Sequence, residues 1–413
     1  MDDAIATALF QNPDLITLRG QEGVSRAALG VARTYPWNPF VQAQYFPNGS
    51  PLVLSNQPGG SAGMSNYYIW VMQRFELAHQ MRFRKQAAGA LLTQVQWNIQ
   101  QGELINVAQT TRLYFAALYQ RELRDLAYEF AQINDRLLGV VERRLHANLA
   151  TPADMTMARV AARQTRRQAD LAEANYQTAL LALRQQMNLP LEAPLVVDDR
   201  ITSFAWSPVQ CIDPESPSLS PTQLAGALVQ SRPDLMAASA GVAVANANAW
   251  LARAARMPDL QVGPIVDTGD DGTQYMGLRV QSDIPVLNTG KPLANQRHAE
   301  LQQQRLTFAQ LNQRAVIEAQ TAIDRYERAR RLAEAAAADH AGPSAAVPAE
   351  LRDITAQFEG GQAEVVAVLN TQANLVLDRR AYLDLLNELA QAAANVVQAT
   401  ALPPRRLAIL PKP

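Results

Sequence analysis

The sequence predicts a mainly α-helical protein with a small β part, built from two copies of a helix–β-hairpin–helix unit. Three observations predict this fold: a recurring Pro-Asp-Leu triplet, two pairs of extended segments joined by turn-forming residues, and two very long helical segments. Internal repetition of this kind indicates that one structural unit occurs twice in the chain.

The repeat is clearest at the triplet Pro13-Asp14-Leu15, which recurs 220 positions later as Pro233-Asp234-Leu235. Each triplet lies in an alanine-rich helical stretch that runs to a second proline, Pro36 or Pro258. Beyond each proline the pattern changes from helical to extended. The predicted bounds are residues 1–188 with an opening helix 1–35, and residues 222–402 with an opening helix 222–256.

Each copy contains one β-hairpin. Clusters of Gly, Asn and Asp between two β-rich runs are typical of hairpin turns. The four predicted strands are 37–46 and 66–76 in the first copy, and 260–266 and 274–284 in the second. Four strands are too few to close a barrel alone.

A very long helical segment follows each hairpin, at 81–146 and 293–358. Such a helix is roughly 100 Å long at about 1.5 Å per residue, which is typical of a coiled coil or a tunnel wall. Gly342-Pro343 and Pro348 predict a break near 342–348. Two interpretations stay open there: a harmless kink, or a joint that opens the tunnel.

Each long helix turns back into a return helix, at 152–187 and 363–400. The first carries a seven-residue repeat of apolar and small residues, as does the second after a shift of 213 positions. Such seams pack helices closely together. An ordinary antiparallel bundle would show the same heptads, so the hairpin inside each copy decides between the two architectures. The first seam is Met155, Ala162, Ala169, Tyr176 and Leu183, and the second is Val368, Leu375, Tyr382, Leu389 and Val396.

Proline-rich sequence fills 189–221 between the copies and 403–413 at the end of the chain. We expect both segments to be non-helical and to pack against the helices rather than to act as flexible linkers.

Composition excludes several classes of protein. The net charge of -1 gives no electrostatic reason to expect a nucleic-acid partner. The sequence contains no uninterrupted apolar run of about 18 residues, so no transmembrane helix is expected. Cys211 is the only cysteine, which excludes an internal disulfide. The sequence opens Met-Asp-Asp without an apolar leader, so we expect either an intracellular protein or a mature region with its signal peptide removed.

No enzyme constellation is evident, and we expect no cofactor and no metal site. The four histidines have no cysteine or carboxylate partner at ligand spacing, so surface or packing roles are expected for them. They are His79, His146, His298 and His340.

At this point the motifs resemble those of the TolC-type outer-membrane factor family. The resemblance rests on the Ala-Leu-x-x-Asn-Pro-Asp-Leu opening at 8–15, the Arg-Pro-Asp-Leu restart at 232–235 and the stretch Ile284-Pro285-Val286-Leu287-Asn288-Thr289-Gly290. Gln73-Arg74-Phe75-Glu76-Leu77, with Arg82 and Arg84, is similar to an element of the cation-efflux (CzcC-like) branch. Ala78-His79 stands where that element has two glycines. The motifs cover essentially the whole chain in the family's order.

The resemblance implies a homotrimer with a twelve-stranded β-barrel in the outer membrane and a long α-helical barrel in the periplasm. It implies contact with outer-membrane lipid, and partnership with a periplasmic adaptor and an inner-membrane pump. The function implied is a passive efflux duct, and the cation-efflux motif favours metal ions over drugs as cargo. The alternative is a non-channel periplasmic coiled-coil adaptor or scaffold protein.

The resemblance also implies where the duct closes. The family's second helix tip has Tyr-x-x-Gly-x-Arg followed by two acidic residues; aligned on Gly361, this chain has Ala363 for the Arg, and Ala367 and Asn370 for the acids. The usual acidic gate is therefore missing. Acidic side chains near the tips could form a ring instead, although helix capping would explain them equally well. The candidate entrance or gate residues are Asp154, Phe358, Glu359, Glu364 and Asn370.

Two further groups follow from the implied architecture. The helix tips are candidates for adaptor contact: Asn148, Leu149, Ala150, Gly360 and Gly361. Aromatic residues concentrate in the predicted strands, where some would lie at the membrane–water boundary, although aromatic residues are also good strand formers. The candidates for this boundary are Trp37, Tyr67 and Trp70.

Overall fold

The computed structural model describes residues 1–46, 65–209, 221–268, 273–339, 353–354, 356–358, 360 and 364–409. The chain divides into two compact units, and each unit combines segments of both sequence repeats. Unit 1 comprises Met1–Arg19, Ile99–Pro233 and Asn312–Pro413, and unit 2 comprises Gly20–Asn98 and Asp234–Leu311. The helices outnumber the strands, so the fold is mostly helical with a small sheet part.

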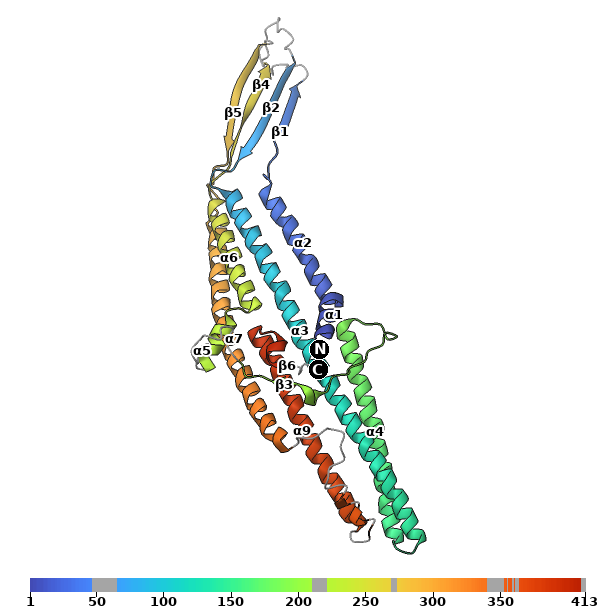
Figure 1. Cartoon of the computed structure of the whole chain (residues 1–413). Coiled ribbons are helices and arrows are strands. Elements are labelled where there is room, and N and C mark those ends of the chain that lie inside the picture. The colour runs from blue at the N-terminus through green and yellow to red at the C-terminus, as the bar shows by residue number, and fades with distance from the viewer. Residues whose placement is uncertain are drawn as a thin grey trace. The chain divides into compact units, whose positions relative to one another are not determined.

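Unit 2 contains a four-stranded antiparallel sheet in which two hairpins lie side by side (Figure 1). The first hairpin pairs β1 (Phe40–Phe46) with β2 (Asn66–Phe75), and the second pairs β4 (Leu260–Thr268) with β5 (Gln274–Ser282). The strand order is β1-β2-β4-β5. The inner strands β2 and β4 therefore join the two repeats, and β1 and β5 are the outer strands.

The strand bounds differ from the predicted ones: β2 ends at Phe75 rather than at 76, β4 extends to Thr268 rather than to 266, and the largest shortening is in β1 and β5. β1 begins at Phe40 rather than at 37, because Pro39 has no N–H to donate to a neighbouring strand. β5 ends at Ser282 rather than at 284, shortly before Pro285, which also lacks an N–H.

The helix predicted over 1–35 is in fact two helices, α1 (Asp2–Gln11) and α2 (Pro13–Arg33). Asn12 separates them: its side-chain oxygen accepts N–H bonds from Asp14 at 3.0 Å and Leu15 at 3.3 Å. The Asn-Pro-Asp-Leu motif is thus a helix start with an N-cap and a proline in the first turn.

The second copy repeats this interruption. The helix predicted over 222–256 is α5 (Pro221–Val229) followed by α6 (Pro233–Ala254). α6 is the one helix in the described part of the chain whose length and apolar composition would suffice to cross a membrane, with a mean hydropathy of 1.3 over its most apolar window. A helix packed in a protein core passes the same test, and 33% of that window is buried, so composition alone does not make α6 a membrane span.

The long helix of the first copy is α3 (Gln80–His146), 67 residues without interruption, and its return helix is α4 (Pro152–Met187). In the second copy α7 (Lys291–Asp339) leads to the return helix α9 (Val365–Thr400). α7 ends earlier than the predicted residue 358. The predicted break near 342–348 lies outside the described residues, so its role stays a prediction.

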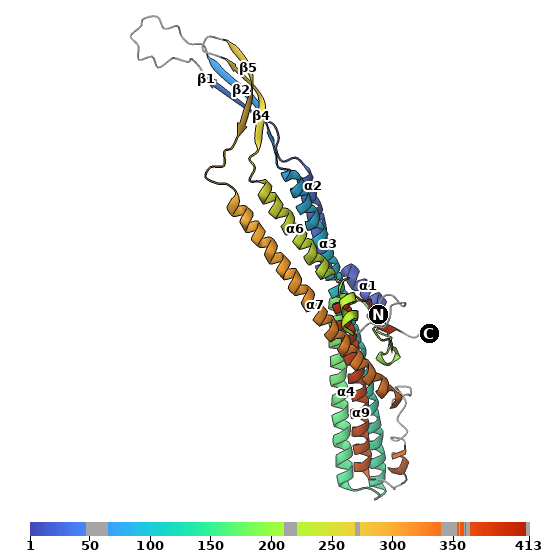
Figure 2. The same ribbon diagram turned by 90° about the vertical axis from the view of Figure 1, so that its left-hand side faces the viewer.

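Unit 1 is held together by the seams of the return helices, and Figure 2 shows α4 beside α9. All five seam residues of α4 are buried. In α9 the buried face differs from the predicted seam, because Leu375 and Tyr382 are only partly buried. Buried residues at other positions of α9 take their place, namely Gln372, Leu383 and Leu386.

The two proline-rich segments meet in unit 1. β3 (Ala205–Trp206) pairs with β6 (Ala408–Ile409), each beside a short 3-10 helix, η1 (Ile201–Ser203) or η2 (Pro404–Arg406). The fully buried Tyr326 of α7 donates its hydroxyl hydrogen to the Ser207 carbonyl at 2.6 Å. These contacts hold the proline-rich segment between the copies and the one at the end of the chain against the helices.

Candidate functional site

The sheet has two chemically different faces, because successive side chains of a strand point to opposite sides. One face, here called the uncharged face, carries no Asp, Glu, Lys or Arg on any of the four strands. Its residues are Val41, Ala43, Tyr45, Tyr67, Ile69, Val71, Gln73, Phe75, Leu260, Val262, Pro264, Val266, Thr268, Gln274, Met276, Leu278, Val280 and Ser282.

The opposite side, here called the charged face, carries Arg74, Asp267 and Arg279 together with several glutamines. The exposure of apolar side chains differs between the faces. On the uncharged face Met276 is 83% and Leu278 69% exposed, whereas Met72 on the charged face is 1% exposed. The sheet therefore presents its apolar side outwards and covers part of its charged side.

The three aromatic candidates for a membrane boundary lie in different places. Tyr67 is on the uncharged face at one end of β2, opposite Tyr45, and its hydroxyl accepts a hydrogen bond from Gln274 at 2.9 Å. Trp37 precedes β1, with the Arg74 guanidinium 4.1 Å from its ring centroid. Trp70 is on the charged face and only 8% exposed, under the Arg279 guanidinium. Trp70 thus lies on the opposite face from Tyr67, because successive side chains of a strand alternate, and its place at a membrane boundary stays a prediction.

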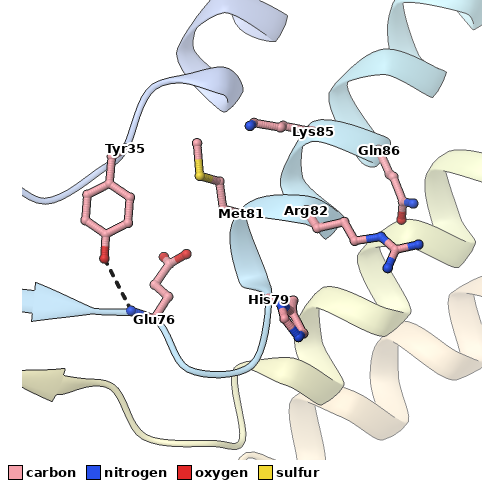
Figure 3. Close-up of a pocket in the computed structure, with 7 residues that line it drawn as sticks. All are labelled: Tyr35, Glu76, His79, Met81, Arg82, Lys85 and Gln86. Atoms are coloured by element: carbon pink, nitrogen blue, oxygen red, sulfur yellow. Dashed lines mark hydrogen bonds between the residues drawn. The ribbon is translucent and has the colours of Figure 1, made fainter.

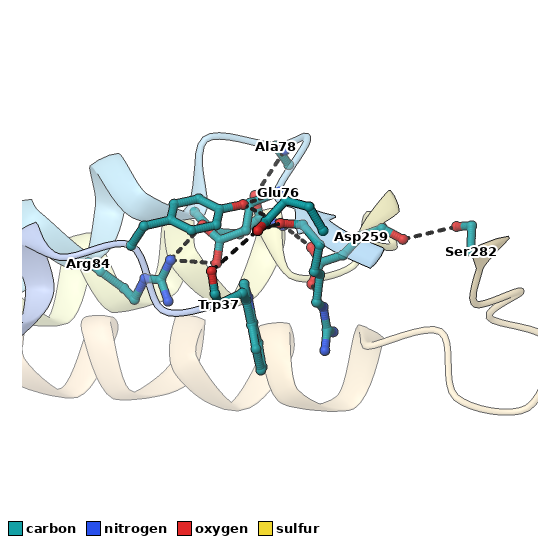
Figure 4. A network of polar contacts seen from close by, with 10 residues as sticks. Trp37, Glu76, Ala78, Arg84, Asp259 and Ser282 are labelled. Atoms are coloured by element: carbon teal, nitrogen blue, oxygen red, sulfur yellow. Dashed lines mark hydrogen bonds and ion pairs between the residues drawn. The ribbon is translucent and has the colours of Figure 1, made fainter. Parts of the chain in front are cut away.

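Below the sheet, a polar network joins the strands of both hairpins to the start of α3 (Figure 4). Arg74 of β2 forms an ion pair with Asp259 at 2.8 Å, and Gln80 donates to the other oxygen of Asp259 at 3.1 Å. Tyr35 donates to the Arg74 carbonyl at 2.7 Å and accepts the Glu76 N–H at 3.3 Å. The network fixes where the strands end and the helices begin.

The motif 73–77 with Arg84 pointed to part of this network, since Glu76 and Arg84 form an ion pair. Asp259 and Tyr35 were not identified from the sequence. Each is far from the motif in sequence, and only the pairing of β2 with β4 brings Asp259 beside Arg74.

A hollow of about 500 Å³ lies next to this network in unit 2 (Figure 3). Two of its lining residues have partners in the network, because Tyr35 accepts the Glu76 N–H and the Glu76 carboxylate forms an ion pair with Arg84. The hollow lies between elements of unit 2. Its lining residues are Tyr35, Glu76, His79, Met81, Arg82, Lys85 and Gln86.

The tip between α3 and α4 is an ordinary helix–helix turn, and residues 146–149 are exposed. Asn148 has a φ of 61°, the left-handed conformation that ends a helix, and the Leu149 N–H donates to the Arg144 carbonyl at 2.8 Å. Leu149 is 68% exposed, while Ala150 is partly buried. At the second tip, the Gly360 N–H donates to the Ala356 carbonyl at 2.9 Å. Gly361 lies outside the described residues.

Asp154, proposed as an entrance residue, belongs to the cap of α4. Thr151 is the N-cap, and the Asp154 carboxylate accepts hydrogen bonds from the Thr151 N–H at 2.9 Å and the Thr151 hydroxyl at 2.7 Å. These bonds, with the nearby Arg144 charge, hold the pKa of Asp154 below its usual range. The geometry supports the capping interpretation of Asp154.

Phe358 is buried rather than available at an entrance, since it is 3% exposed. It packs in an apolar cluster that includes Val141 and Met155, and the Arg144 guanidinium lies 4.7 Å from its ring centroid. Arg144 also donates a hydrogen bond to the Phe358 carbonyl. Arg144 thus fastens the second tip to the first, and Phe358 is a packing residue in this chain.

Two of the remaining entrance candidates, Glu364 and Asn370, are exposed. Glu364 is the N-cap residue of α9, where its carbonyl accepts the Ala367 N–H at 3.1 Å but its carboxylate makes no capping bond. Asn370 is exposed two turns further along this helix. Glu359 lies outside the described residues. Of the acidic candidates that the structure describes, Glu364 is the one whose carboxylate is not used for capping.

No protein-family model matches the chain. Among curated proteins, it is 28% identical over 216 residues to the pyoverdine export outer membrane protein OpmQ of Pseudomonas putida, covering 49% of this chain and 44% of that protein. It is 24% identical over 400 residues to the cation efflux system protein CusC of Escherichia coli K12, covering 92% of this chain and 82% of CusC. The chain thus spans less than half the length of the OpmQ relatives that it matches.

Solved structures give the same fold. CusC superposes with a TM-score of 0.74 at 17% identity, covering 97% of this chain and 91% of that one. The open state of the Neisseria gonorrhoeae MtrE outer membrane channel superposes with a TM-score of 0.71 at 19% identity, covering 98% of this chain and 89% of that one. The outer-membrane channel OprN has a TM-score of 0.72 at 14% identity, with 97% and 89% of the two chains covered.

Proposed function

From its membership of the TolC-type outer-membrane factor family, we propose that the chain is one protomer of a homotrimeric duct that passively exports small solutes. The family locates it in the outer membrane, with a part that extends into the periplasm. The relatives are efflux channels rather than enzymes. In the proposed assembly, three copies contribute a twelve-stranded β-barrel and a helical tunnel, which meets a periplasmic adaptor and an inner-membrane pump.

The observation that carries this proposal is the absence of charge from one whole face of the sheet. A soluble sheet gains nothing from exposing Met276, Leu278 and Val280 to water, since each exposed apolar side chain forgoes burial free energy of about 1.5–3 kcal/mol. In a membrane barrel the same residues would face lipid, and the alternate residues, with Arg74, Asp267 and Arg279, would face the water-filled lumen.

The outer strands also favour a trimer. β1 and β5 each have one edge without a strand partner in the described chain. Unpaired backbone groups in lipid would destabilise the fold by several kcal/mol each, so a spanning sheet must close on itself. Pairing β5 of one copy with β1 of the next would close twelve strands around a three-fold axis.

The helix tips are proposed to contact the adaptor, through the exposed Leu149 of the first tip and the Gly360 turn of the second. Glu364 is the proposed acidic residue of the entrance, because its carboxylate is exposed and not committed to a cap. Three copies would bring it into a ring around the axis.

The cargo proposed is metal ions or other small toxic compounds. Among the relatives, CusC is named for cation efflux and OpmQ for pyoverdine export, so related ducts serve different cargoes. The motif around Arg74 and Arg84 favoured cations as cargo. Both arginines, however, form ion pairs within the network below the sheet. The motif therefore gives no independent argument for cations.

A single pair of variants tests the proposal. Leu278→Arg places a charge on the uncharged face, where it should oppose membrane insertion by about 2–4 kcal/mol. Gln42→Arg is the matched control, because Gln42 lies at nearly the same height in the sheet as Leu278 but on the charged face. We expect heat-sensitive trimers in detergent gels and single-channel conductance for the wild type and Gln42→Arg, and loss of both for Leu278→Arg. A monomeric wild type without conductance would reject the duct in favour of a periplasmic scaffold.

A further inference from the structure

Arg279 and Trp70 form a stacked pair on the charged face of the sheet. The Arg279 Cζ atom lies 4.6 Å from the centroid of the Trp70 ring, although the two residues belong to β5 and β2. β4 runs between these strands, so the Arg279 side chain must reach across it. Such a contact holds a guanidinium in one position over an aromatic ring.

A glycine keeps the surface beside Arg279 low. Gly263 of β4 pairs with Arg279 and adds no side chain between the guanidinium and β2. In the neighbouring row, Ile265 of β4 lies between Trp70 and Gly277. At Gly263 no other residue fits, because a Cβ atom would lie 1.7 Å from the Val71 carbonyl oxygen.

The charge of Arg279 is not neutralised within the described chain. The other arginine of this face, Arg74, forms an ion pair with Asp259 at 2.8 Å. Arg279 has no carboxylate within ion-pair distance among the described residues, and its contact there is with the π face of Trp70. Asp267, the acid of this face, pairs with Tyr275, four residues along β5 from Arg279. An aromatic ring orients a cation without cancelling its charge, so the positive potential extends beyond the pair.

We propose that Arg279, held on Trp70, is an anion-binding site in the lumen of the barrel and makes the duct favour anionic solutes among the small toxic compounds proposed as cargo, rather than metal cations. This inference rests on the proposed function, which turns the charged face towards the lumen. In a trimer, three guanidinium groups would stand at one level of the channel. A ring of basic side chains raises the local concentration of anions and opposes the passage of cations.

The test is the reversal potential of single trimers in a planar bilayer under a KCl gradient. Arg279→Gln should lower the chloride-to-potassium permeability ratio about twofold or more, and Arg279→Glu should lower it further. Arg279→Lys should stay close to the wild type, since it keeps the charge. Arg82→Gln, which removes an exposed arginine from the first turn of α3 outside the sheet, is the control and should not change the ratio.

A charge added after folding separates electrostatics from misfolding. Arg279→Cys in a Cys211→Ser background would be modified with a cationic or an anionic thiol reagent in assembled channels. The cationic adduct should raise chloride permeability and the anionic adduct lower it. An unchanged ratio in Arg279→Gln, or equal effects of the two adducts, would overturn the anion site. Absence of channels in the wild type would instead reject the proposed function itself.

Discussion

The two sequence repeats adopt the same backbone at their junctions but stabilise it with different side chains. Both long helices follow a residue in the left-handed conformation: His79, with φ 59°, precedes α3, and Gly290, with φ 67°, precedes α7. The carbonyl of each residue accepts the N–H of the first helical turn, from Arg82 at 2.9 Å and Ala294 at 3.1 Å. Glycine adopts this conformation without strain and histidine does not.

The helix tips differ in the opposite sense. α4 of the first repeat begins with a complete capping box between Thr151 and Asp154, whereas α9 of the second begins at Glu364 without a side-chain cap. The first repeat therefore has the strained residue, His79, at the sheet end of its long helix. The second repeat lacks the side-chain cap, at Glu364 of its tip. The two repeats share a backbone path at these positions but differ in the side chains that stabilise it. A substitution can therefore introduce the kind of residue that one repeat uses at the equivalent position of the other.

The largest effect is expected in the strands. Gly263 of the inner strand β4 corresponds to Ala43 of the outer strand β1 at the 220-residue spacing of the Pro-Asp-Leu triplets. Gly263→Ala should destabilise the sheet by about 3 kcal/mol or more, because the new Cβ atom would meet a backbone oxygen that cannot move aside. Ala43→Gly should change stability by less than about 1 kcal/mol. Thermal unfolding followed by circular dichroism would measure both, and equal midpoints would contradict the expected tight approach of β2 and β4.

The next effect concerns the contact between the tips. Arg144→Ala removes the stacking on Phe358 and the hydrogen bond to its carbonyl, so we expect a loss of about 1–3 kcal/mol. The exposed neighbour Arg143→Ala is the matched control. Limited proteolysis at the second tip should become faster in Arg144→Ala but not in Arg143→Ala. Identical cleavage rates in the two variants would contradict a role of Arg144 in holding the tips together.

At the strand–helix junctions, changes in opposite directions are expected. Gly290→Ala should destabilise the protein by about 1–2 kcal/mol, because the left-handed backbone disfavours a Cβ atom. That Cβ atom would also lie 2.9 Å from the Arg256 side chain. His79→Gly should stabilise it by about 0.5–1 kcal/mol through relief of the same strain. The midpoint of thermal unfolding should fall in Gly290→Ala and rise in His79→Gly. A shift of both midpoints in the same direction would contradict the claim that the two junctions have the same backbone conformation.

The smallest effect is the exchange of caps. Thr151→Ala should destabilise α4 by about 1 kcal/mol, and Glu364→Asp should stabilise α9 by up to about the same amount. Because the folded pKa of Asp154 is lowered, its contribution is present above the unfolded pKa and is lost as pH falls through the folded value. The difference between wild type and Thr151→Ala should therefore shrink in acid, and a difference that grew below pH about 4 would reject this cap.

The periodic part of the first repeat was predictable from sequence, whereas the seam predicted for α9 was wrong at Leu375 and Tyr382. The residue bounds of α4 and its buried seam follow from a heptad pattern whose spacing is local. The interruption at Asn12 was missed because an Asn-Pro pair inside an alanine-rich stretch resembles a tolerated irregularity. The hydrogen bonds of the Asn12 side chain show that it is a cap.

The faces of the sheet could not be assigned before the register of β2 against β4 was known. Tyr67 and Trp70 are both strand aromatics three positions apart, so alternation places them on opposite faces, but only the pairing of the strands shows that their uncharged sides form one continuous face. Phe358 was a candidate entrance residue, yet it is buried among residues of the first repeat, including Val141 and Met155. Contacts between the repeats decide these assignments, and no local pattern encodes them.

The central claim, that the uncharged face meets lipid and the charged face meets the lumen, is tested most directly by lipid-phase quenching. A small fluorophore attached at Leu278→Cys or at Gln42→Cys, each in a Cys211→Ser background, would be measured in vesicles containing brominated phospholipid. Strong quenching at position 278 with little at position 42 is the predicted result. Equal quenching at the two positions, or stronger quenching at position 42, would contradict the proposed orientation of the sheet.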